Sequence, residues 1–165
     1  MYQVNDTIIY GTQGVCKIVE ITEKDFKGKI KEYFVLKPIN NSNTTLFAPT
    51  DNQAILAKMR RILSKEEILE LVNSVSNDEI AWIANDNQRR DKFKEFLISG
   101  DHRMLILMIK SIWLQKQKRE AEGKKLHMSD ERFFKDAEQL LYDEFQYVLQ
   151  ISKNDLISYI FKSKE

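Results

Sequence analysis

Basic side chains lie close to a tryptophan in the middle of the chain, and this grouping could bind a polyanion. Its members are Trp82, Arg89, Arg90, Lys92 and Lys94. Basic side chains can hold phosphates without reading base sequence, and an aromatic ring can insert beside them. Asp91 and Glu95 interleave with these cations, so the run could equally be a solvated helix face. The pattern alone leaves both interpretations open.

The two tryptophans occupy different sequence environments. Trp113 follows the most apolar run of the chain, residues 104–109, and is predicted to be core. Trp82 is predicted in the first turn of a helix opened by a Ser76-x-x-Glu79 capping box, among polar neighbours. A ring near a solvated surface is the better candidate for contact with nucleic acid. The alternative is that Trp82 packs on Phe93 or on the first helix as a structural residue.

Other residue types give no sign of catalysis. The two histidines are isolated, and the single cysteine, Cys16, reads as a small apolar strand residue. The sequence contains no phosphate loop, no hydrolase elbow and no metal-ligand spacing. We therefore expect no enzyme activity, no catalytic residue, no metal and no cofactor. With no signal-peptide pattern and no apolar run of about 20 residues, we expect a soluble cytoplasmic protein without membrane contact.

The net charge of +1 hides a local excess of basic residues. Residues 73–128 carry 11 basic and 8 acidic side chains, a balance of +3, whereas the residues after them are acidic overall. Nucleic-acid contact, if present, should therefore be local, and tight non-specific binding is not expected.

The elements that would position these residues change type once, near Arg61. Residues 1–63 contain both prolines and short β-branched runs, which predict strands over 7–10, 15–21, 32–37 and 44–48 among about five in all. This length favours a small curled barrel with one open edge strand. Residues 64–165 show helical periodicity, with five helices starting near Ser64, Ser76, Asp101, Ser129 and Ser152. The predicted fold class is α+β, a small Tudor/SH3-like β-barrel followed by a compact all-α bundle.

Several motifs in this order resemble a known family. The N-terminal ones are Tyr10-x-x-x-Gly14-Val15, Ile18-x-x-Ile21, Lys27-Gly28-x-x-Lys31-Glu32-Tyr33-x-Val35-Leu36 and a strand closing on Pro49. Those in the helical part are Ser99-Gly100-Asp101, Ile112-Trp113 and Ala137-x-x-Leu140-Leu141-x-x-Glu144. Over about residues 1–150 the chain resembles the CarD/CdnL transcription regulators, whose N-terminal domain is shared with bacterial transcription-repair coupling factors.

The resemblance implies a barrel that pairs with the β subunit of bacterial RNA polymerase through basic residues on two neighbouring strands. Carried over by position, the first of these falls on Lys24, with Phe26 close by. The second falls on Leu46 or Phe47, neither of which is basic, so the contact here should be more apolar. The alternative is that Phe26 is only a hairpin-tip residue and that Phe47 belongs to the core.

The resemblance also implies a tryptophan that wedges into the minor groove at the upstream edge of the melted promoter bubble. We assign that role to Trp82 and phosphate contacts to the basic set. The family's basic residues follow the tryptophan almost at once, whereas Arg89 and Arg90 come seven and eight positions later. The leading prediction is a non-enzymatic regulator, associated with the nucleoid through polymerase, that stabilises the open promoter complex. The alternative is an adaptor whose helical domain recruits another protein through the apolar stripe of its last two helices.

Overall fold

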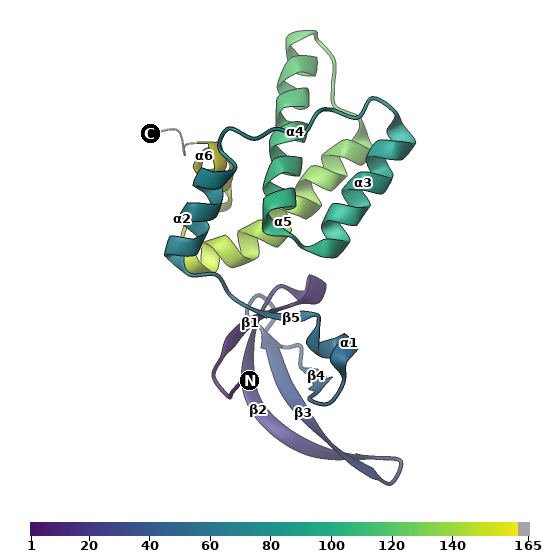
Figure 1. The fold of residues 1–165 in the computed structure, drawn as a ribbon, viewed down its shortest axis with the longest axis vertical. Helices are drawn as coiled ribbons and strands as arrows, with labels where there is room; N and C mark the ends of the chain where they lie inside the picture. The colour runs from purple at the N-terminus through teal and green to yellow at the C-terminus, as the bar shows by residue number, and fades with distance from the viewer. Residues whose placement is uncertain (162–165) are drawn as a thin grey trace. The chain divides into compact units, whose positions relative to one another are not determined.

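The computed structural model describes residues 1–161 and divides into two compact units, Met1–Leu63 and Ser64–Glu165. The first contains a sheet and the second contains helices (Figure 1). The α+β class expected from the sequence is therefore confirmed. Among the described residues, no helix is both long enough and apolar enough to cross a membrane.

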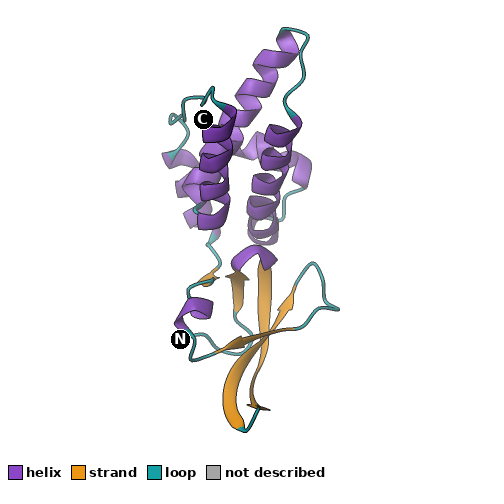
Figure 2. Ribbon diagram, turned by 90° about the vertical axis from the view of Figure 1, so that its right-hand side faces the viewer, coloured by secondary structure: helices purple, strands orange, loops and turns teal. Residues whose placement is uncertain are grey.

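The first unit is an antiparallel sheet, whose strands are orange in Figure 2. The strand order is β4-β3-β2-β1-β5. Its elements are β1 (Thr7–Tyr10), a 3-10 turn (Gly11–Gln13), β2 (Val15–Phe26), β3 (Lys29–Pro38), β4 (Leu46–Pro49), α1 (Gln53–Leu56) and β5 (Met59–Arg61). The described strands β4 and β5 form the two edges and do not pair with each other. Closure into a barrel therefore stays a prediction.

The β2–β3 hairpin is longer than the sequence indicates. Strand β2 continues to Phe26 and β3 begins at Lys29, so only Lys27 and Gly28 form the turn. Both have positive φ, 54° and 80°, as a tight two-residue hairpin turn requires. The hairpin arm is mostly solvent-exposed on both faces, so its residues show no apolar alternation from which strand length could be read.

The core of the first unit lies on one face of this sheet. Its buried members are Ile8, Cys16, Ile18, Phe34, Leu36, Ala48 and Met59. Cys16 is fully buried, and burial raises the pKa of its thiol to about 11. The expectation that Cys16 is an apolar strand residue is confirmed.

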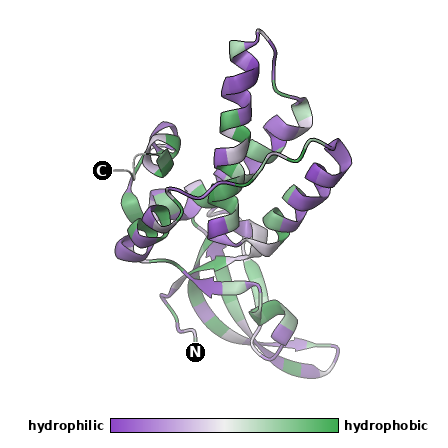
Figure 3. Cartoon of the chain, turned by 45° about the horizontal axis from the view of Figure 1, so that its top comes forward, coloured by the Kyte–Doolittle hydropathy of each residue, from purple (hydrophilic) through white to green (hydrophobic). Residues whose placement is uncertain are grey.

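The second unit contains five helices among its described residues, as expected. They are α2 (Lys65–Ser74), α3 (Asp86–Ser99), α4 (His102–Ala121), α5 (Met128–Leu149) and α6 (Lys153–Phe161). The helix start expected near Ser64 is a capping box, in which Ser64 and Glu67 form both hydrogen bonds, and Gly100 ends α3 in the left-handed region. Helix α4 is buried from Leu105 to Ile112 and hydrophilic towards its C-terminal end (Figure 3).

The expected helix start at Ser76 is wrong. Residues 78–84 are irregular, and α3 begins later, where the Asn85 side chain accepts a hydrogen bond from the Gln88 N–H at 3.0 Å. The reason is Lys110 of the buried helix α4. Its Nζ atom donates to the Val75, Ser76 and Asp78 carbonyls at 2.9–3.1 Å. The Ser76 and Asp78 carbonyls turn towards the ammonium group, and the Val75 carbonyl accepts from both this group and the Asp78 N–H at 3.1 Å, a turn that does not continue as a helix.

Candidate functional site

Two of the four predicted polymerase-contact residues touch on the outer face of the sheet. The Lys24 Nζ atom lies 3.6 Å from the centroid of the Phe47 ring, a cation–π contact between β2 and β4 across β3. The Phe47 ring meets Tyr33 edge-on at 6.5 Å and remains 43% exposed. The alternative that Phe47 is core is therefore wrong, because its side chain points away from the buried cluster.

The other two members lie differently. Alternation along β2 places Phe26 on the same face as Lys24, near the hairpin tip, where it is 66% exposed. Leu46 pairs with Leu36 and packs against the buried cluster on the opposite face. The outer-face patch therefore consists of Lys24, Phe26, Tyr33 and Phe47, and Leu46 supports it from the core side.

The patch borders an edge strand with an unusual pattern of backbone donors. The Thr50 N–H donates to the Glu32 carbonyl, so alternation makes Ala48 and Leu46 the residues of β4 that bond to β3. The backbone groups of Phe47 and Pro49 then face away from the sheet. Proline has no N–H, so it fits an outward-facing edge position and leaves Phe47 as the outward amide donor within this four-residue strand.

The opposite edge, β5, is partly covered by the chain's own N-terminal segment. Its strand register puts the Met59 backbone groups on the outer side, and the Tyr2 hydroxyl donates to the Met59 carbonyl at 3.1 Å. Strand β4 is therefore the edge better able to accept a strand from a partner.

In the second unit, Trp82 lies in the irregular segment before α3, not in a helix. The ring is half-buried, with the Arg89 Cζ atom 4.6 Å from its centroid and the Phe93 ring edge-on at 6.2 Å. These contacts fix the ring against the helical unit while part of it stays exposed. Trp113 is also half-buried, not fully core, and packs on Phe161 at 4.7 Å.

Arg89 is not on a solvated surface, contrary to the sequence interpretation. The residue is 2% exposed, and its Nε and Nη2 atoms donate to the two carboxylate oxygens of Asp130 at 2.8 and 2.9 Å. It also donates to the Ile83 carbonyl at 2.9 Å and to Asp86 at 2.8 Å. Burial alone would lower the pKa of the Arg89 guanidinium, but these carboxylates raise it above its ordinary value. Its donors are committed within the protein, so we remove Arg89 from the phosphate-binding set.

The remaining basic residues of the set are exposed. Arg90 and Lys94 are one helical turn apart on α3 and therefore share a face. Lys92 lies 3.5 Å from Glu95 and over the Phe96 ring, on another side of the helix. The set is thus split between two faces.

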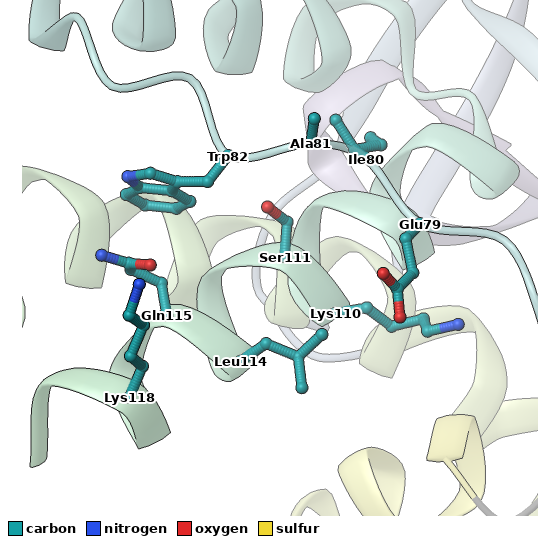
Figure 4. Close-up of a pocket in the computed structure, with 9 residues that line it drawn as sticks. All are labelled: Glu79, Ile80, Ala81, Trp82, Lys110, Ser111, Leu114, Gln115 and Lys118. Carbon is teal, nitrogen blue, oxygen red and sulfur yellow. The ribbon is translucent and has the colours of Figure 1, made fainter. Parts of the chain in front are cut away.

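A hollow of about 230 Å³ lies beside Trp82, within the helical unit (Figure 4). Side chains of the irregular segment and of α4 line it, among them Glu79, Trp82, Ser111, Leu114, Gln115 and Lys118. In Figure 4, Glu79 lies at one end, whereas Trp82, Gln115 and Lys118 gather at the other. The sequence analysis missed Gln115, Lys118 and Asp130. Asp130 is separated from Arg89 by 41 positions, so no local sequence pattern connects the two residues.

Comparison with known proteins identifies the first unit. Residues 2–63 match the family model of the CarD-like/TRCF RID domain. These residues are a CarD-like/TRCF RID domain. The outer-face patch and the β4 edge therefore both belong to the RID domain, within the matched range.

A relative covers the helical unit as well. The chain is 24% identical over 162 residues, 96% of its length and 99% of the relative's, to the Bacillus subtilis (strain 168) protein named "Putative transcription factor YdeB". The RID domain and this relative together give the protein a transcription-related role. The expected resemblance to CarD-like regulators is confirmed.

Proposed function

We propose that this protein is a non-enzymatic transcription regulator that binds the β subunit of RNA polymerase through its RID domain. The observation that carries the proposal is the contact of Lys24 with Phe47 on an exposed face beside the edge strand β4. A partner strand can pair with the outward backbone groups of Phe47, while its side chains contact the aromatic rings and the ammonium group. This arrangement supplies a short main-chain pairing at Phe47 together with side-chain selectivity.

The helical unit, in this proposal, contacts promoter DNA at the upstream edge of the melted bubble. Trp82 provides an aromatic surface, and Arg90, Lys92 and Lys94 provide phosphate contacts. A protein stabilises the melted state only by its preference for that state over closed duplex. A preference of about 1.4 kcal/mol would shift the melting equilibrium tenfold. The protein would therefore act in the cytoplasm, on the nucleoid, through polymerase.

The adaptor alternative draws on the apolar stripe and the acidic charge of the last two helices. The apolar stripe of the last two helices is used inside the unit, where Ala137, Leu141 and Phe145 of α5 and Leu156 and Ile160 of α6 are buried. The other members on α5, Phe133, Phe134, Leu140 and Val148, are half-buried, so only part of the stripe is open to another protein.

Binding of the full chain to an isolated β-lobe fragment tests the polymerase contact. Lys24→Glu and Phe47→Ser should each weaken binding strongly, because each removes one half of the cation–π contact. Lys58→Glu is the matched control, since Lys58 is exposed in the same unit but precedes β5 at the other edge. Equal losses from Lys58→Glu and Lys24→Glu would show a general charge effect and refute the proposed surface.

A further inference from the structure

We propose that the hollow beside Trp82 holds a single unpaired nucleobase of the melted DNA strand, with Lys118 on its phosphate. This inference rests on the proposed function and names the DNA state that the helical unit recognises. Trp82 offers the part of its ring not covered by Arg89, and Leu114 adds apolar surface from α4. Base–aromatic contacts of this kind tolerate any base, because every base has a π-face.

The size of the hollow suits one base. Sites for drug-sized molecules are usually about 300–1,000 Å³, and the hollow, at about 230 Å³, is smaller. A duplex cannot enter such a space, since its bases stay stacked and paired. A base next to the edge of a melted bubble has already lost its partner, so most of the cost of extruding it is already met.

Charge sets the orientation of the nucleotide. Lys118 lies at the Trp82 end and forms no ion pair with another described residue, so its ammonium group can bind a phosphate. Glu79 lies at the far end, where its carboxylate would repel a phosphate but could accept a hydrogen bond from an exocyclic amino group. Lys110 does not compete for the phosphate, because its Nζ atom already donates to three backbone carbonyls. The phosphate therefore binds near Lys118 and the base points towards Glu79.

A neighbouring lysine provides a matched control. Lys116 lies on α4 two positions before Lys118, but its Nζ atom is 3.9 Å from Glu131 and it does not line the hollow. Removing either charge changes the net charge equally, so only a specific site separates the two variants.

The experiment measures binding of a short labelled single strand, and of the duplex of the same sequence, by fluorescence anisotropy over a range of salt concentrations. The full chain should prefer the single strand. Lys118→Gln should weaken that binding about threefold to tenfold and flatten its log–log salt dependence by about 0.7, the value of one single-strand phosphate contact. Lys116→Gln should change the slope much less. In a Trp113→Phe background, where Trp82 is the sole tryptophan, the single strand should also quench the indole emission.

The outcomes separate this inference from the proposed function. Equal or tighter binding to duplex, or identical behaviour of the two lysine variants, overturns the base-binding hollow and leaves the polymerase and duplex contacts standing. If neither DNA form binds, even in complexes with polymerase, the DNA half of the proposed function fails as well. Quenching of Trp82 by an acidic peptide but not by the single strand would show that the hollow binds protein instead.

Discussion

The buried pair of Arg89 and Asp130 should stabilise the helical unit and hold Trp82 in place. Asp130→Ala leaves the guanidinium at 2% exposure with only Asp86 and the Ile83 carbonyl as hydrogen-bond partners. Removing one partner of a buried pair costs about 3–5 kcal/mol, because the other charge remains in a site with little water. Since 1 kcal/mol corresponds to about 4 °C in a unit of this size, the melting temperature should fall by roughly 12–20 °C.

Thermal unfolding followed by circular dichroism measures this loss, and a second readout follows Trp82. Without Asp130 the guanidinium should move from the ring, so Trp82 emission in the Trp113→Phe background should shift in the folded state. Asp136→Ala is the matched control on α5, because Asp136 is exposed. Replacing both partners, with Arg89→Met and Asp130→Leu, should cost less than the sum of the single changes. An Asp130→Ala protein that melts within a degree or two of Asp136→Ala would refute the assignment.

Four further outcomes follow from the structure. Trp82→Ala should cost only about 1–2 kcal/mol of unfolding free energy in denaturant titrations, because the half-buried ring loses one aromatic and one cation–π contact; a cost of about 3–5 kcal/mol would mark a full core residue. Cys16 should react with a thiol reagent at least about 100-fold more slowly in the native protein than in denaturant, since burial raises its pKa to about 11; comparable rates would contradict its burial. Gly100→Ala should lower the free energy of unfolding by about 1 kcal/mol in the same titrations, because Gly100 has a φ of +63°. An unchanged midpoint would contradict the role of Gly100 as the left-handed C-cap of α3. The hydrogen bond from Arg89 lowers the pKa of Asp86 in the folded state. The stability that ionised Asp86 adds to the fold should therefore be complete above about pH 5 and lost as pH falls through that lowered pKa. An Asp86→Asn protein that is still less stable than the native protein at acid pH would contradict this.

The sequence predicts best those elements whose signals are local. The Ser64 capping box, the left-handed Gly100, the Asp101 cap and the Ser152 start are all specified within four residues, and the structure has each of them. The apolar run of α4 likewise identifies the central buried helix. In these places short-range chemistry and tertiary packing agree.

The errors arise where a distant residue overrides a local signal. The capping pattern at Ser76 fails because Lys110, 34 positions later, takes the carbonyls of that turn. The sequence predicts Arg89 as a surface cation beside Arg90, yet it is buried, where it pairs with the Asp130 carboxylate 41 positions away on α5. No local pattern contains either partner. The outer-face patch shows the same limit. The sequence position could not decide whether Leu46 or Phe47 faces the partner, whereas the strand register places Phe47 on the outer face and Leu46 on the core face.

The single outward amide of β4 also bears on how long a partner stays bound. A strand added at this edge meets Phe47 and then Pro49, so few main-chain hydrogen bonds can form before the donors run out. Dissociation rates follow the number and quality of such contacts more than association rates do. The complex should therefore exchange quickly, and its lifetime should depend on the side-chain contacts at Lys24 and Phe47. Under the proposed function, the share of polymerase that carries this protein would then follow its cellular concentration.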